Sequence, residues 1–219
     1  MKKFFVLSLI LLACPVLLFS QKEVPFRHGK ISSGFYLKIG AAIPVSNFSM
    51  GQFVPDMTPG PKDDSFTFLA PRTGPVLDLG FLIYTGPAFA NRMLRAGIDA
   101  TFMSSSFNPT NPDLDPDEDQ IEYWYFFMGQ KFGPVITMNP IDRLMLDFSY
   151  KVCTNFSYYD DWLGLGLWNQ EVSFTVRYSI MAAGVQYHFG KINYNEFDKN
   201  NPDKIADIST VRVLFGLKF

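Results

Sequence analysis

The sequence predicts an all-β chain that closes as a single antiparallel β-barrel and crosses a membrane with its strands. Three observations predict it: segments that alternate apolar with polar or small residues, many aromatic residues, and an apolar N-terminal segment typical of exported proteins. The chain has 219 residues, which suits one domain, and 23 of them are Phe and 10 are Tyr. Charged residues make up 18%, below the ~25% of a typical soluble domain.

The N-terminal segment has the features of a signal peptide. Lys2 and Lys3 precede a long apolar run, and Ser20 supplies a small residue before the expected cut. We therefore expect residues 1–20 to be the signal peptide and residues 21–219 to form the barrel domain. A second interpretation treats Leu-Leu-Ala-Cys at residues 11–14 as a lipoprotein signal, which would leave Cys14 lipidated. After residue 20 no apolar stretch of ~18 residues remains, so no transmembrane helix is predicted there.

Six segments alternate with the period of a β-strand. They place apolar residues on one face and charged or small residues on the other, over about the ~9–11 residues that a tilted membrane-spanning strand needs. A soluble sandwich has the same period. The signal peptide, the aromatic content and the alternation of long and short connections favour the membrane barrel. The segments are residues 35–43, 76–83, 94–103, 143–152, 172–179 and 211–219.

The strand count depends on the region 172–189. Its apolar residues are even-numbered up to Tyr178 and odd-numbered from Val185, so either a turn or a bulge must separate the two halves. A turn between residues 179 and 184 gives eight strands, with ten as the alternative. A bulge would give an odd number, which single-chain bacterial barrels avoid. The strand within 121–138 is the least clear, because aromatic residues occupy both faces and Pro134 interrupts it.

The connections divide into two kinds. The short ones are predicted at 86–92 and 139–142, where Asn139-Pro140 signals a tight turn. The long ones are expected on the cell exterior. They span residues 46–72, 104–119, 156–170 and 197–207.

The predicted inward face carries ten titratable residues. We expect them to form a network of paired charges, because an eight-stranded barrel is just wide enough inside for side chains. The alternative is an anion-selective pore, since bases outnumber acids on this face. The residues are Lys38, Asp78, Arg95, Asp99, Arg143, Asp147, Lys151, Arg177, His188 and Arg212.

Catalytic and cofactor signatures are sparse. The sequence has two histidines, His28 and His188, and neither has a serine or acid signature beside it, so no enzyme and no cofactor is predicted. Cys153 is expected to be a small inward-facing side chain rather than a reactive thiol. Carboxylates alternate at Asp113, Asp115, Asp117 and Asp119, a weak candidate for Ca²⁺. The segment lacks the Gly and Glu of an EF-hand, so solvated charge is the expectation.

An apolar, aromatic stretch at residues 158–168 has two interpretations. It either extends the strands and adds to an aromatic girdle, or it forms a docking surface for a protein or glycan. The residues concerned are Tyr158, Tyr159, Trp162, Leu165 and Trp168.

The two ends of the chain resemble small outer-membrane β-barrel proteins of Bacteroidota, a porin-like family. The Lys2-Lys3 start, the Phe19-Ser20-Gln21 end of the signal, and the closing strand 211–219 carry this resemblance. It implies the outer membrane of a Gram-negative bacterium, contact with its lipid, and recognition of the C-terminus by barrel-assembly machinery. The residues implied in that recognition are Val213, Phe215, Leu217 and Phe219.

The predicted role is structural or interactive, through extracellular loops on a barrel whose lumen is filled. One alternative is a small porin-like channel for anionic or small polar solutes. Another is an accessory barrel of a secretion or gliding machinery. The net charge of −2 gives no basic bias, so no nucleic-acid partner is expected.

Overall fold

The computed structural model describes residues 31–45, 48–49, 51–52, 68–90, 93–112, 123–141, 143–159, 162–196 and 204–219. The predicted signal peptide, Cys14, His28 and the Ca²⁺ candidate at Asp113, Asp115, Asp117 and Asp119 lie outside these residues. Within the described ranges, no helix is long and apolar enough to cross a membrane.

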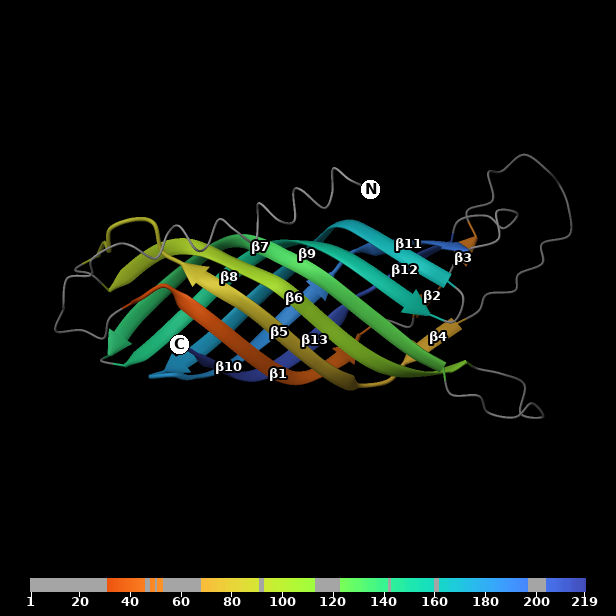
Figure 1. Cartoon of the computed structure of the whole chain (residues 1–219), viewed down its shortest axis with the longest axis horizontal. Coiled ribbons are helices and arrows are strands. Elements are labelled where there is room, and N and C mark those ends of the chain that lie inside the picture. Colours follow the sequence, from red (N-terminus) through yellow and green to blue (C-terminus); the bar gives the residue numbers. More distant parts are fainter. Residues whose placement is uncertain are drawn as a thin grey trace, which may run out of the picture.

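Eight antiparallel strands close into a barrel (Figure 1). Around the barrel the order is β1, β5, β6, β7, β8, β9, β10 and β13, and β13 pairs with β1 to close the sheet. This confirms the predicted fold class and the count of eight. The strands are β1 (Gly34–Pro44), β5 (Gly74–Ile83), β6 (Leu94–Pro112), β7 (Tyr123–Ile141), β8 (Leu144–Tyr159), β9 (Trp162–Tyr178), β10 (Met181–Phe189) and β13 (Thr210–Lys218).

A two-residue turn joins β9 to β10 and accounts for the change of parity seen in the sequence. Tyr178 pairs with Met181, so Ser179 and Ile180 form the turn. Ser179 has a φ of 57°, the left-handed conformation that tight hairpins use, and its N–H donates to the Arg143 carbonyl at 3.0 Å. The turn is therefore confirmed, and a bulge is not needed at this point.

The two ends of the barrel differ. We call the end with the β7–β8 and β9–β10 turns and Phe219 the turn rim. At the other end, the extended rim, β6 to β9 continue to 16–19 residues. Five short strands join them there (Figure 1). These are β2 (Phe48–Ser49), β3 (Gly51–Gln52), β4 (Phe68–Pro71), β11 (Lys191–Glu196) and β12 (Lys204–Asp207).

The extended rim corrects two of the predicted long connections. Residues 104–112 continue β6, and residues 156–170 belong to a hairpin of β8 and β9, with only 160–161 between the strands. Residues 104–112 are mostly small polar residues and proline, and residues 156–170 mix aromatic residues with Gly and Asp, so both stretches lack the regular alternation by which the other strands were found. Residues 158–159 and 162–168 thus extend the strands, and a docking surface on them stays a prediction.

A β-bulge in β6 shifts the inward face by one residue. Thr101 and Ser104 pair with Lys131 and Gly129 of β7, and the two residues between them have no partner on β7. Ser104 is fully buried while Met103 is not, so Ser104 takes the inward position that the strict alternation assigned to Met103. Elsewhere the predicted faces of 35–43, 76–83 and 211–219 agree with the burial pattern.

The barrel interior is polar and its exterior is apolar. Among the described residues, 26 polar or charged side chains are buried against 16 apolar ones, and 29 large apolar side chains are exposed. Every charged side chain in the described parts of the eight barrel strands lies on the inward face. This is the reverse of a soluble barrel, in which the interior would be apolar.

Candidate functional site: the barrel lumen

The centre of the lumen is an ion-pair network built around Lys131 of β7. Its ammonium donates to Glu171 at 2.7 Å and to Asp78 at 3.2 Å, with all three side chains fully buried. Gln186 of β10 accepts from Lys131 at 3.3 Å and donates to Asp78 at 3.1 Å. Since the charges come from β5, β7 and β9, the network connects distant parts of the barrel wall.

Two further cations extend this network. Lys151 lies 2.9 Å from Asp99 and 3.3 Å from Glu171. Arg212 lies 3.8 Å from Asp78 and donates to the Ser104 hydroxyl at 2.8 Å. Each buried carboxylate of the centre thus has a cation beside it, which lowers the cost of removing these charges from water.

A second cluster lies closer to the turn rim. The Arg177 guanidinium pairs through two nitrogens with Asp147, one of them at 2.8 Å, and its Nη2 also donates to the Tyr84 hydroxyl at 3.2 Å. Thr137 donates to Asp147 at 2.6 Å. This two-pronged geometry suits arginine and is stronger than a single contact. The cluster occupies the lumen between the central network and the turn rim.

The segment before β1 closes the turn rim. Ile31 is 7% exposed and packs in an apolar cluster with Tyr84 and Met145, among others. Arg95 donates to the Ile31 carbonyl at 2.5 Å, and Lys218 donates to the Ser32 carbonyl. Two cations therefore hold this segment across the mouth of the barrel.

Toward the extended rim the lumen contains an aromatic ring, that of Phe127. The guanidinium of Arg212 lies 5.2 Å from the ring centroid of Phe127, and the His188 ring meets the same Phe127 edge-on at 5.4 Å. A cavity of about 10 Å³ adjoins His188, room for about one water. Side chains therefore fill the lumen around His188 and Phe127.

Most of the ten predicted lumen residues are where the alternation put them. Eight are buried inside the barrel and take part in the contacts above or lie beside them: Lys38, Asp78, Asp99, Asp147, Lys151, Arg177, His188 and Arg212. Arg95 is half-buried at the turn rim. Arg143 is a correction: it is exposed and has a φ of 65°, because it belongs to the tight turn before β8 rather than to the strand.

Sequence reasoning missed three charged members of the lumen. Lys131 lies on the strand whose faces could not be distinguished, and Glu171 lies one residue before the segment assigned as a strand. Residues two apart on a strand share a face, so the inward position of Ser173 implies an inward position for Glu171. Lys218 is buried on the inward face of the closing strand, where it shares the parity of Arg212, so the same alternation would have found it.

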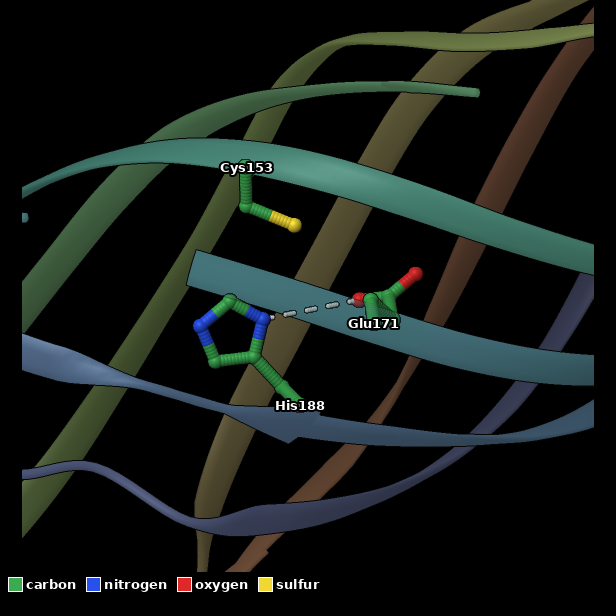
Figure 2. A group of neighbouring side chains, drawn as sticks. All are labelled: Cys153, Glu171 and His188. Atoms are coloured by element: carbon green, nitrogen blue, oxygen red, sulfur yellow. Dashed lines mark ion pairs between the residues drawn. The ribbon is translucent and has the colours of Figure 1, made fainter. Parts of the chain in front are cut away.

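Three chemically reactive side chains lie close together in the part of the lumen toward the extended rim (Figure 2). Cys153 of β8, Glu171 of β9 and His188 of β10 are all buried, and their sulfur, oxygen and nitrogen ligand atoms lie within 4.8 Å of one another. His188 Nδ1 is 3.9 Å from Glu171 Oε2, beyond a hydrogen bond. Cys153 is the small inward-facing residue that was expected, but its neighbours were not.

The predicted docking residues lie on the β8–β9 hairpin at the extended rim. Tyr158, Leu165 and Trp168 are exposed, Trp168 by 76%. Trp168 has a φ of 72° and lies at a register shift between β8 and β9, where it has no partner residue on β8. Tyr159 and Trp162 belong to the same hairpin, at its tip.

The closing strand presents its apolar face outward. Phe215 and Phe219 are 61% and 66% exposed, and the Phe219 ring lies 6.5 Å from that of Phe35 across the barrel seam. Val213 and Leu217 share this face. The geometry is the one that the resemblance implied for a C-terminal assembly signal, although recognition by assembly machinery stays a prediction.

Comparison with known proteins gives distant similarities. No protein-family model matches the chain, and no curated protein sequence does. Among solved structures, the outer membrane protein OprG from Pseudomonas aeruginosa has 12% sequence identity and a TM-score of 0.49, covering 89% of this chain and 99% of OprG. Neisserial surface protein A has 12% identity and a TM-score of 0.37, with 86% of this chain and 99% of that chain covered. Values this low assign neither a family nor a function.

Proposed function

We propose that this chain is an outer-membrane β-barrel that is closed to solutes and acts through its extended rim. The observation that carries the proposal is the inverted distribution of side chains. Charges of the barrel strands point inward, most of them into ion pairs, while the outward face is mainly apolar. Such an exterior is stable in lipid, where all backbone groups must pair within the closed sheet.

The filled lumen supports a structural or interaction role over transport. Along the barrel, the lumen holds in turn the Ile31 segment, the Arg177 cluster, the central network and the Phe127 ring. Cations outnumber carboxylates in the lumen, as the sequence indicated, but a surplus of positive charge needs an open path before it can select anions.

Conductance in planar bilayers tests whether the lumen is closed. We expect the folded full-length protein to give no stable open level at physiological salt, because solutes would have to displace buried ion pairs. A porin incorporated under the same conditions is the control for insertion. A reproducible open level with anion selectivity would contradict the proposal and favour the porin-like channel.

The extended rim is proposed as the surface that meets a partner outside the cell. Its β8–β9 hairpin exposes Leu165, Leu167 and Trp168, an apolar surface well away from the turn rim. Exposed aromatic side chains such as that of Trp168 are enriched in protein interfaces. A partner in a secretion or gliding machinery would be one example of such a contact.

Cysteine labelling on intact cells tests the orientation that this role requires. In a Cys153→Ser background, Trp168→Cys should react with a membrane-impermeant maleimide. The control Ile180→Cys, 54% exposed at the turn rim, should react only after the outer membrane is permeabilised. Labelling of position 180 but not 168 from outside would place the hairpin in the periplasm and exclude an extracellular partner there.

A further inference from the structure

We propose that Cys153 and His188 form a binding site for one soft monovalent metal ion of the Cu(I) class inside the barrel. Thiolate sulfur and imidazole nitrogen are the ligands that such ions prefer in proteins. Both side chains are about 99–100% buried and approach each other from β8 and β10, on either side of β9 (Figure 2). The site is separate from the extended rim and is not used by the proposed function.

The distances fit a metal bridge between the two residues. Metal–sulfur and metal–nitrogen bonds of ~2.3 and ~2.0 Å allow one ion to join atoms up to ~4.3 Å apart. The ligand atoms of the cluster lie within 4.8 Å of one another, so sulfur and nitrogen need to close by at most about 0.5 Å. The Cys153 thiol has only a weak contact, 3.9 Å to the Lys151 carbonyl, which holds it loosely.

Unsatisfied polar atoms around His188 support the site independently. His188 Nδ1 and Asn155 Oδ1 are both buried without a hydrogen-bond partner, while Asn155 Nδ2 lies 3.0 Å from His188 Nε2. Turning over the Asn155 amide would let Oδ1 accept from Nε2–H. Nδ1 then presents its lone pair beside Cys153 Sγ, and the amide orients the imidazole as partners of metal-bound histidines do.

The surrounding charges select a monovalent ion over a divalent one. The ion-paired side chains of the adjoining network are three cations and three carboxylates, while the lumen as a whole has more cations than carboxylates: the paired groups are Lys131, Lys151 and Arg212, and Asp78, Asp99 and Glu171. A thiolate with a monovalent ion leaves this balance unchanged. A thiolate with a divalent ion adds one buried positive charge without a counter-ion, at a considerable cost.

Glu171 completes the arrangement as a neighbour rather than a ligand. Its carboxylate is held by Lys131 at 2.7 Å and by Lys151 at 3.3 Å. Binding a metal through Glu171 would therefore break one of the shortest ion pairs of the lumen. When the ion binds, the thiol proton leaves to solvent and the sulfur–metal and nitrogen–metal bonds form, with no change of oxidation state.

Silver(I), a redox-inert probe of this class, tests the site in the folded barrel. One equivalent is added while the full-length protein folds into detergent micelles, and excess metal is removed with a competing chelator. We expect about one Ag(I) per barrel by elemental mass spectrometry and at least a tenfold loss in Cys153→Ser and in His188→Gln. Cys14→Ser is the matched control and should bind like the parent. Zn(II) added in the same way should not be retained.

Two results would overturn the proposal. One is a folded Cys153→Ser barrel that retains as much Ag(I) as the parent; the other is retention of Zn(II) equal to that of Ag(I). Folding is followed by heat-modifiable gel migration. If neither variant folds, X-ray absorption at the silver edge on the parent protein decides: one sulfur and one nitrogen are expected, and a shell without sulfur contradicts the site.

Discussion

Lys131→Met is expected to lower the free energy of unfolding by about 3–5 kcal/mol, the cost typical of breaking one side of a buried ion pair. Lys131 is 1% exposed and is the cation shared by Glu171 and Asp78. Methionine fills a similar volume but leaves both carboxylates with fewer partners in a dry lumen. Urea titration of the folded fraction, read from heat-modifiable gel migration, measures the change.

Lys191→Met is the matched control for this prediction. It makes the same substitution at an exposed position of β11, so the change should stay within about 0.5 kcal/mol. Adding Glu171→Gln to Lys131→Met should cost less than the sum of the two single changes, because the uncompensated carboxylate is then removed. Equal stability of the Lys131 and Lys191 variants would show that the lumen pairs do not hold the barrel together.

Phe174→Lys should destabilise the barrel in phospholipid vesicles by about 2–4 kcal/mol, the cost of a cation on the lipid face near the bilayer midplane. Phe174 faces outward on β9, and its ring centroid lies 4.7 Å from that of Phe148 on β8. It is five residues from the turn at Ser179, roughly half the height of the apolar band for a tilted strand. Unfolding by urea with intrinsic fluorescence measures the loss.

Two companion variants separate the contribution of the lipid from that of the ring contact. Phe174→Leu removes the aromatic pair but keeps the face apolar, so it should cost less than the lysine. Leu165→Lys puts the same charge on the same strand at the extended rim, where the side chain is 54% exposed and the proposed membrane position leaves it outside the lipid. A cost at position 165 as large as at position 174 would contradict the proposed membrane position of the barrel.

Much of the barrel wall could be predicted from local pattern. Alternation separates inward from outward residues without any knowledge of the neighbours, because successive side chains of a strand point to opposite faces. The parity change between Tyr178 and Val185 was enough to locate a turn, which the pairing of Tyr178 with Met181 confirms. The pattern failed at Met103 and Arg143, where a bulge and a left-handed turn residue break the period.

The sequence by itself determined which strand faces carry charge and which are apolar, since this follows from the period of two along one strand. The change of parity between Tyr178 and Val185 favoured eight strands over an odd number. Only the tertiary structure decided which charges meet. Lys131, Asp78 and Glu171 come from three strands far apart in the chain, and closure of the sheet brings both carboxylates within 3.2 Å of the Lys131 ammonium. The same closure brings Cys153 to His188. Which side chains meet across a barrel depends on the stagger of its strands and on its diameter, and the sequence of a single strand determines neither.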